Sequence, residues 1–274
     1  MASDLRPLTL GELLDRTFFL YRKNFILFVG IVALPNLVLL AFQLAGVGLQ
    51  SMHLLLGPAA RIPWMLAVWV VSLGVTAASQ GATVIAVSHV HLGRPVTIAE
   101  SFAGMKGRIL EIALIMIGYW IGIGVGLVLL IVPGIILLLM WALTIPVAVI
   151  EDTGLRDSVN RSAELTKGHR GRVFVIGLLF LILLYVVYMI WEIPIFAIMA
   201  FMARGHRLVS VPVWTRLAVP VGNFFSQCLA APLMTIGLSL LYYDERVRKE
   251  AFDLQHMMST LDTMQPIAAP LAGV

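Results

Sequence analysis

Long apolar runs without charge alternate with short charged segments along this chain. No Asp, Glu, Lys or Arg occurs in residues 24–60, 62–93, 112–150, 173–191 or 217–243. A helix of about 20 apolar residues is long enough to cross the hydrocarbon core of a bilayer. The first three runs exceed that length, and the third has room for two crossings. The pattern predicts an all-α polytopic membrane protein.

The apolar runs and the breaks between them predict six transmembrane helices in a single membrane domain, residues 1–254. The expected spans are approximately 25–49, 63–90, 109–132, 134–150, 173–202 and 211–243. Pro133 and Gly134 interrupt an uncharged stretch, so we expect a tight turn there, at the far membrane surface. Residues 255–274 are expected to form a cytoplasmic tail that is disordered at its end.

Amphipathic segments precede three of the spans, at residues 8–23, 97–107 and 153–168. In the first, Thr9 and Glu12 have the spacing of a capping box, in which each side chain bonds a free backbone amide of the first helical turn. Thr97 and Glu100 have the same spacing. Helices with one apolar and one charged face lie in the plane of the membrane interface. We therefore expect three cytoplasmic interfacial helices.

The most charged segment, residues 156–172, has counterparts earlier in the chain. Residues 160–167 resemble residues 15–22, and Ser162, Lys167 and Gly168 recur at the offsets of Ser101, Lys106 and Gly107. One hypothesis is a three-fold internal repeat of an interfacial helix followed by a transmembrane hairpin. The alternative is that any amphipathic helix entering a membrane has this pattern. The repeat would make Arg161, Ser162, Lys167 and Gly168 structural positions.

Charge gives the expected orientation. Only 12% of residues are charged and 60% are hydrophobic. With six spans both termini share one side, and that side has 15 of the 19 Lys and Arg residues. Cytoplasmic loops are the ones enriched in Lys and Arg. We expect a multi-pass protein of a bacterial inner membrane with both termini in the cytoplasm.

Basic side chains beside membrane spans favour contacts with anionic lipid head groups over contacts with nucleic acid. Membrane lipids are therefore the expected partners, and no protein partner is indicated, although a homo-oligomer is compatible with the sequence. The candidate head-group contacts are Arg16, Arg22, Lys23, Lys106, Arg108, Arg161, Lys167, Arg170 and Arg172.

A polar face is expected inside the second span. Ser72, Thr76, Ser79 and Thr83 recur at helical spacing, with Gln80 adjacent. Such a face is either a helix-packing surface of small residues or the wall of a polar cavity. Glu192 is a separate outlier, because an ionisable residue inside a membrane span suggests function by default. Its alternatives are structural pairing near Arg204 or Arg207, and a transport or gating role.

No catalytic constellation is apparent. The side chains of His89 and His91 point about 200° apart on a helix, which is poor geometry for sharing a metal. Glu151 and Asp152 are expected to be helix-capping acids. Cys228 is the single cysteine and is expected to be a packing residue. No nucleophile triad, Walker loop or dinucleotide motif occurs, so we expect no enzyme activity and no catalytic, cofactor or metal site.

Four segments resemble bacterial polytopic proteins of the glycerophosphoryl diester phosphodiesterase membrane domain family. They are residues 10–25, 132–134, 161–174 and 242–254, so the resemblance covers nearly the whole chain. In larger members such a region precedes a catalytic barrel, a fold of about 200 residues or more. Only 20 residues follow Leu254. The resemblance therefore implies a membrane module without phosphodiesterase activity, and no catalytic residues carry over.

Two functions follow from these observations. The first is a non-catalytic scaffold or lipid-associated membrane module. The alternative is a small-solute or lipid transporter that uses the polar face from Ser72 to Thr83, Glu192, and Asn223 and Gln227 of the sixth span. A cavity lined by these residues would favour transport, and a solid bundle would favour the scaffold.

Overall fold

The computed structural model describes residues 8–51, 58–205 and 213–250, and within these residues every regular element is a helix. Six helical stretches are long and apolar enough to cross a membrane. The all-α, multi-pass prediction is thereby confirmed.

The helices are α1 (Leu10–Lys23), α2 (Phe25–Ser51), α3 (Pro58–His91), α4 (Ile98–Ala103), α5 (Ile109–Leu129), α6 (Ile131–Met140), α7 (Thr144–Glu151), α8 (Leu155–Thr166), α9 (Arg170–Gly205) and α10 (Val213–Glu250). The expected tail, residues 255–274, lies outside the described residues.

The turn between the third and fourth spans is not where the sequence predicts it. The chain turns at Leu130, whose extended backbone (φ −162°, ψ 140°) separates α5 from α6. Pro133 lies in the first turn of α6, where its missing N–H is no loss because that N–H has no partner within the helix. A Cβ on Gly134 would lie 2.7 Å from the amide nitrogen of Leu127. Gly134 therefore allows α6 to pack closely against α5, and the chain turns at Leu130.

The predicted fourth span is broken in two. α6 ends at Met140, three residues follow in turn conformation, and α7 begins at Thr144. No Pro or Gly lies within Trp141–Leu143, but Pro146, in the first turn of α7, has no N–H to donate to the Ala142 carbonyl, so the sequence carries one local signal for the break.

The three amphipathic segments contain the helices α1, α4 and α8, although α4 covers only residues 98–103 of the predicted 97–107. Their place in a membrane interface stays a prediction. The capping boxes of Thr9 with Glu12 and of Thr97 with Glu100 are both formed. Glu151 and Asp152 were expected to be helix-capping acids, and Asp152 is the C-cap of α7. They end α7, where Asp152 adopts the left-handed conformation (φ 54°), and the N-cap of α8 is Gly154. The chain thus runs three times from an interfacial helix into a hairpin, although the middle hairpin differs in shape.

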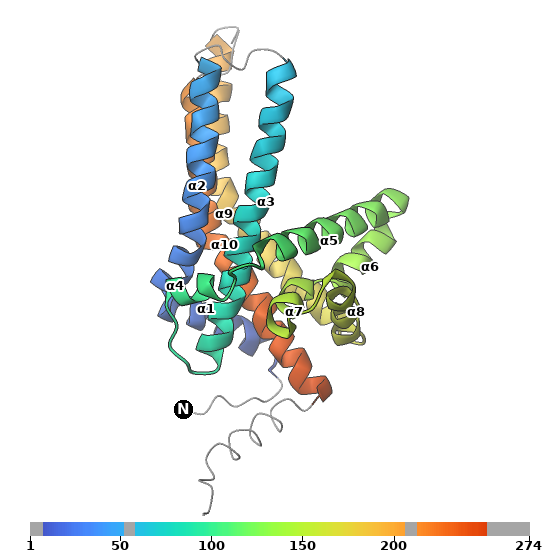
Figure 1. Cartoon of the computed structure of the whole chain (residues 1–274). Coiled ribbons are helices and arrows are strands. Elements are labelled where there is room, and N and C mark those ends of the chain that lie inside the picture. Colours follow the sequence, from blue (N-terminus) through green and yellow to red (C-terminus); the bar gives the residue numbers. More distant parts are fainter. Residues whose placement is uncertain (1–7, 52–57, 206–212, 251–274) are drawn as a thin grey trace, which may run out of the picture.

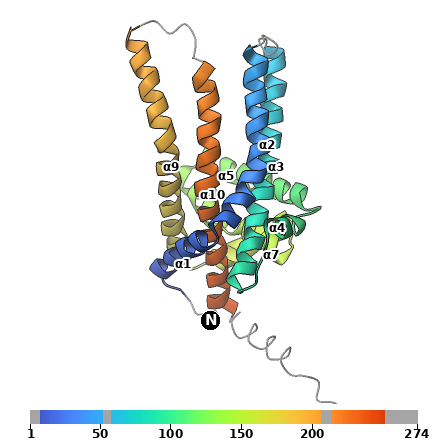
Figure 2. The same cartoon turned by 90° about the vertical axis from the view of Figure 1, so that its left-hand side faces the viewer.

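Four long helices, α2, α3, α9 and α10, run side by side, as Figures 1 and 2 show. The helices α1 and α8 and the C-terminal end of α10 lie at the same end of these rods (Figure 1). α5 and α6 instead slope away obliquely, and their tip stops short of the far ends of α2 and α3 (Figure 1). α10 packs against both α2 and α9, whereas α3 packs against α2, α5 and α10. The helices α3 and α9 are therefore two walls with α10 between them.

The interior is best packed at the end where the interfacial helices gather. Leu13 of α1, Phe28 of α2, Leu143 beside α7 and Tyr242 of α10 are fully buried there in one cluster. The Tyr21 hydroxyl donates to the Leu229 carbonyl at 2.9 Å and so ties α1 to α10. Towards the other end, long helices expose large apolar side chains, as expected for surfaces that contact lipid chains.

Candidate functional site

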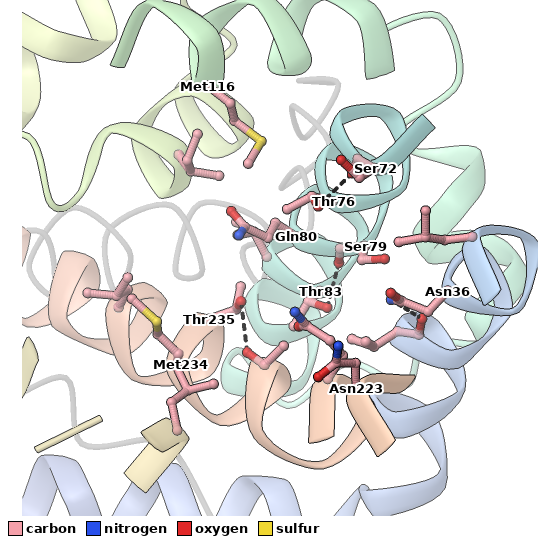
Figure 3. A pocket seen from close by; sticks show the side chains of 18 of the residues that line it. Asn36, Ser72, Thr76, Ser79, Gln80, Thr83, Met116, Asn223, Met234 and Thr235 are labelled. Carbon is pink, nitrogen blue, oxygen red and sulfur yellow. Dashed lines mark hydrogen bonds between the residues drawn. The ribbon is translucent and has the colours of Figure 1, made fainter. Parts of the chain in front are cut away.

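A cavity of about 720 Å³ lies between the walls formed by α3 and α9. Side chains of α2, α5, α7 and α10 complete it, and most of its lining is apolar or aromatic. Figure 3 shows polar side chains from α2, α3 and α10 that converge on this space. The polar lining residues are Asn36, Gln43, Ser72, Thr76, Ser79, Gln80, Thr83, Asn223, Gln227 and Thr235.

The polar face of α3 lines the cavity, so of its two predicted roles the cavity wall is the one observed. The Thr76 hydroxyl donates to the Ser72 carbonyl and the Thr83 hydroxyl to the Ser79 carbonyl, each at 2.7 Å. Ser72 donates in the same manner to the Trp69 carbonyl at 2.7 Å. A hydroxyl has one proton and two lone pairs. With the protons used inside the helix, the oxygens of the half-buried Ser72 and Thr76 are available as acceptors, whereas Thr83 is fully buried. The buried Ser79 hydroxyl on the same face has no partner in the described structure.

Amide side chains face α3 from α2 and α10 (Figure 3). Asn36 donates to the Val32 carbonyl of its own helix at 2.8 Å. Asn223 and Gln227 lie one helical turn apart on α10, as the sequence predicts for a shared face. Within the described residues, no hydrogen bond engages the side chain of Gln80, Asn223 or Gln227. These three amides are available to a ligand.

Aromatic residues form the base of the cavity and its opening. Trp141, at the break between α6 and α7, lies against Gly122 so closely that a Cβ there would be 2.3 Å from its ring. Trp120 of α5 and Leu181 and Tyr185 of α9 line the cavity but are 57–61% exposed. Residues that both line the cavity and are exposed on the protein surface lie at the opening of the cavity, its mouth. The cavity therefore opens sideways, between α5 and α9.

None of the described residues that line the cavity is charged. Glu192, which was grouped with this face as a candidate, is a half-buried residue of α9 outside the lining. The transport role expected for it has no support from the cavity. Its expected pairing cannot be followed, since Arg207 and the side chain of Arg204 lie outside the described part of the chain.

Three of the nine predicted head-group contacts bind protein groups instead. Arg172 pairs with Asp244 (Nη1–Oδ2, 2.6 Å), and Arg161 pairs with Glu151 and Glu250. Burial opposes the charged form of Arg161, but the two carboxylates outweigh it, so its pKa is raised.

The third, Arg108, caps the end of α7. It pairs with Asp152 at 2.5 Å and donates to the Ala148 carbonyl at 3.0 Å. Of the other six predicted contacts, Arg22, Lys23, Lys106 and Lys167 are exposed, and Arg16 and Arg170 are half-buried. Their lipid contacts stay a prediction.

A buried acidic pair on α10 organises this charged end, and the sequence analysis missed it. The carboxylate of Asp244 is fully buried and accepts from Arg172, from Arg248 at 2.9 Å and from the Leu8 amide at 2.5 Å. Glu245, also fully buried, lies 2.7 Å from Nδ1 of His169. The only sequence signal was the position of Asp244 and Glu245 directly after a long apolar run, where buried acids need basic partners.

The histidines and the cysteine do not form a reactive site in the described structure. His91 is buried and stacks on Tyr243, with ring centroids 5.0 Å apart. Cys228 is a buried free thiol, as expected for a packing residue. Within the described residues, no three His, Cys, Asp or Glu side chains are grouped so that they could hold a metal ion.

Comparison with known proteins adds no assignment. Scans of family models, of curated proteins and of solved structures each found no match to this chain. Function must therefore be inferred from the cavity itself.

Proposed function

We propose that this chain is a non-catalytic, lipid-associated membrane protein that binds a lipid-like amphiphile in the cavity between α3 and α9. The observation that supports this is one cavity with uncharged polar groups on its inner walls and an aromatic mouth open to the side. Small-molecule sites commonly combine an apolar lining with a few convergent polar groups, in volumes of about 300–1,000 Å³.

The two parts of an amphiphile match the two parts of this site. Its polar group would bond Gln80, Asn223 and Gln227, and its hydrocarbon chain would leave past Leu181 and Tyr185. In a bilayer that mouth would face lipid, so a chain emerging there would remain in hydrocarbon. A polar group deep in a membrane needs partners, because an unmatched one costs several kcal/mol.

A second candidate is a permease for a small neutral solute. It is favoured by the polar face of α3, which extends over about three helical turns from Ser72 to Thr83 opposite Asn223. A water-filled path along this face would conduct a solute without lipid. The pure scaffold is the weaker alternative, since a scaffold needs no such cavity.

We place the charged end of the molecule in the cytoplasm of a bacterial cell, with the chain in the inner membrane. The support is the excess of Lys and Arg at that end. The exposed Lys106 and Lys167 would contact anionic head groups there. The resemblance to the glycerophosphoryl diester phosphodiesterase membrane domain family remains a proposal of the same kind.

Mass spectrometry of the purified protein tests the binding proposal. The chain is released from detergent in the gas phase, and retained molecules are identified. We expect a stoichiometric amphiphile that the double variant Gln80→Leu, Asn223→Leu loses and the surface variant Asn160→Leu keeps. If the unmodified protein, the double variant and Asn160→Leu all retain the amphiphile equally, the amphiphile binds outside the cavity. Uptake of a neutral solute by proteoliposomes, without bound amphiphile, would select the permease.

A further inference from the structure

We infer that the group bound inside the cavity is uncharged and rich in hydroxyls, so that an uncharged lipid with free hydroxyls is selected over an anionic one. This inference rests on the proposed function and specifies the chemistry of its ligand. Two independent observations lead to it, one from hydrogen bonding and one from charge.

The first observation is a surplus of acceptors on the cavity wall. The protons of the Thr76 and Thr235 hydroxyls, both half-buried residues, are donated to carbonyls of their own helices, at 2.7 and 3.2 Å. What these groups offer to a ligand is oxygen lone pairs. The free amides of Gln80 and Asn223 each add an acceptor as well as donors. A complementary ligand must bring donors, and hydroxyl groups bring one each.

The second observation is the absence of any charged side chain from the described lining. A phosphate or carboxylate could accept from the amide N–H groups of Gln80 and Asn223, but it would lie beside the hydroxyl oxygens without a compensating cation. Of the Arg residues at the charged end, Arg172 is paired with Asp244, and Arg161 is paired with Glu151 and Glu250. Removing an ion from water into such a site costs several kcal/mol. A hydroxylated, neutral group avoids that cost.

Depth in the membrane strengthens the charge argument. Thr76 lies near the middle of the 34-residue helix α3, so the polar groups lie well away from its two ends. A lipid whose polar group reaches that depth leaves the interfacial region. The energetic difference between neutral and ionised head groups is largest there, because no water is available to solvate the charge.

An uncharged group rich in hydroxyls could belong to a lipid head group or to a free polyol. The test therefore uses the full chain in nanodiscs of phosphatidylcholine, with three separate additions. These are dioleoylglycerol, dioleoylphosphatidic acid with the same acyl chains, and free glycerol. Native mass spectrometry and competition with a fluorescent dioleoylglycerol report occupancy.

We expect dioleoylglycerol to occupy the cavity at least tenfold more than phosphatidic acid. Competition by glycerol alone at similar concentration would assign the hydroxylated group to a soluble polyol. Equal or stronger binding of phosphatidic acid would overturn the inference but leave the proposed function standing. If no addition binds, the proposed function fails as well.

Variants at the wall link selectivity to the named groups. Thr76→Val and Thr235→Val keep the side-chain shape and remove the acceptor oxygens, so we expect each to lower dioleoylglycerol binding severalfold. Gln80→Arg adds a cation and is expected to shift the preference towards phosphatidic acid. Should Gln80→Arg fail to fold, the two Thr→Val variants still decide the question. Unchanged binding in both, with Asn160→Leu as control, would contradict the assignment.

Discussion

The Ser162 hydroxyl donates to the Met140 carbonyl at 2.8 Å and accepts the Leu143 amide at 3.1 Å. These are two of the backbone groups that the break between α6 and α7 leaves without helical partners. Thr166, one turn further along α8, also lies within hydrogen-bonding distance of the Met140 carbonyl, at 3.2 Å. An interfacial helix therefore stabilises a broken span, and the break places Trp141 at the cavity.

Replacement of Ser162 by Ala tests this bridge. The change leaves the buried Leu143 amide without its partner, and an unsatisfied buried group costs about 1–3 kcal/mol. We expect a lower thermal unfolding midpoint in detergent. Ser72→Ala is the matched control, because that hydroxyl bonds only the carbonyl of Trp69 in its own helix. Equal midpoints for the two variants would show that the bridge is dispensable.

The contact between Gly122 and Trp141 predicts a second pair of results. In Gly122→Ala the new Cβ would meet the indole ring at 2.3 Å, and overpacking of this kind costs about 1–3 kcal/mol. Displacement of Trp141 should also weaken amphiphile binding. Gly124, two residues away, has no neighbouring atom within 4 Å of a built Cβ. Gly124→Ala should be neutral or stabilising by up to about 1 kcal/mol. The comparison is made by thermal unfolding and by retained amphiphile.

The buried ion pair of Asp244 and Arg172 predicts a large loss of stability in Asp244→Asn. Neutralising the carboxylate leaves the Arg172 guanidinium, with a side chain only 15% exposed, without its counter-ion. Removing one partner of a buried pair costs about 3–5 kcal/mol. Lys106→Ala, at an exposed position, should change the unfolding midpoint little. A small effect of Asp244→Asn would mean that solvent reaches Arg172.

The tip of the α5–α6 hairpin predicts a labelling pattern. Residues 127–132 are all apolar and exposed, and the tip stops short of the far ends of the long helices (Figure 1). Such a tip is stable in hydrocarbon and not in water. With Cys228→Ala as background, Leu130→Cys should resist a membrane-impermeant maleimide in vesicles of either orientation. Detergent should restore its labelling, and Lys106→Cys should react without detergent in vesicles whose charged end faces outward. Labelling of Leu130→Cys in intact vesicles would place the tip in water.

Features that depend on neighbouring residues could be predicted from the sequence. The apolar runs gave the spans, and Thr9 with Glu12 gave a helix start, since a capping box needs only four residues. The shared face of Ser72 and Thr83 likewise follows from helical periodicity. Pro146 is a local signal for a break near Ala142, but the bonds that stabilise the break could not be predicted, because their partner, Ser162, lies 22 residues from Met140. The pairing of Arg172 with Asp244 joins residues 72 apart and has no local signature.

The bond between the Leu8 amide and Asp244 has a consequence for the making of the protein. It links residues 236 positions apart, and Arg172 also donates to the Leu8 carbonyl, at 2.8 Å. Leu8, just ahead of α1, therefore gains its partner only after α10 has been synthesised. Until then Arg172 lacks its partner Asp244, so a chain that stops before α10 leaves the Arg172 guanidinium without this carboxylate.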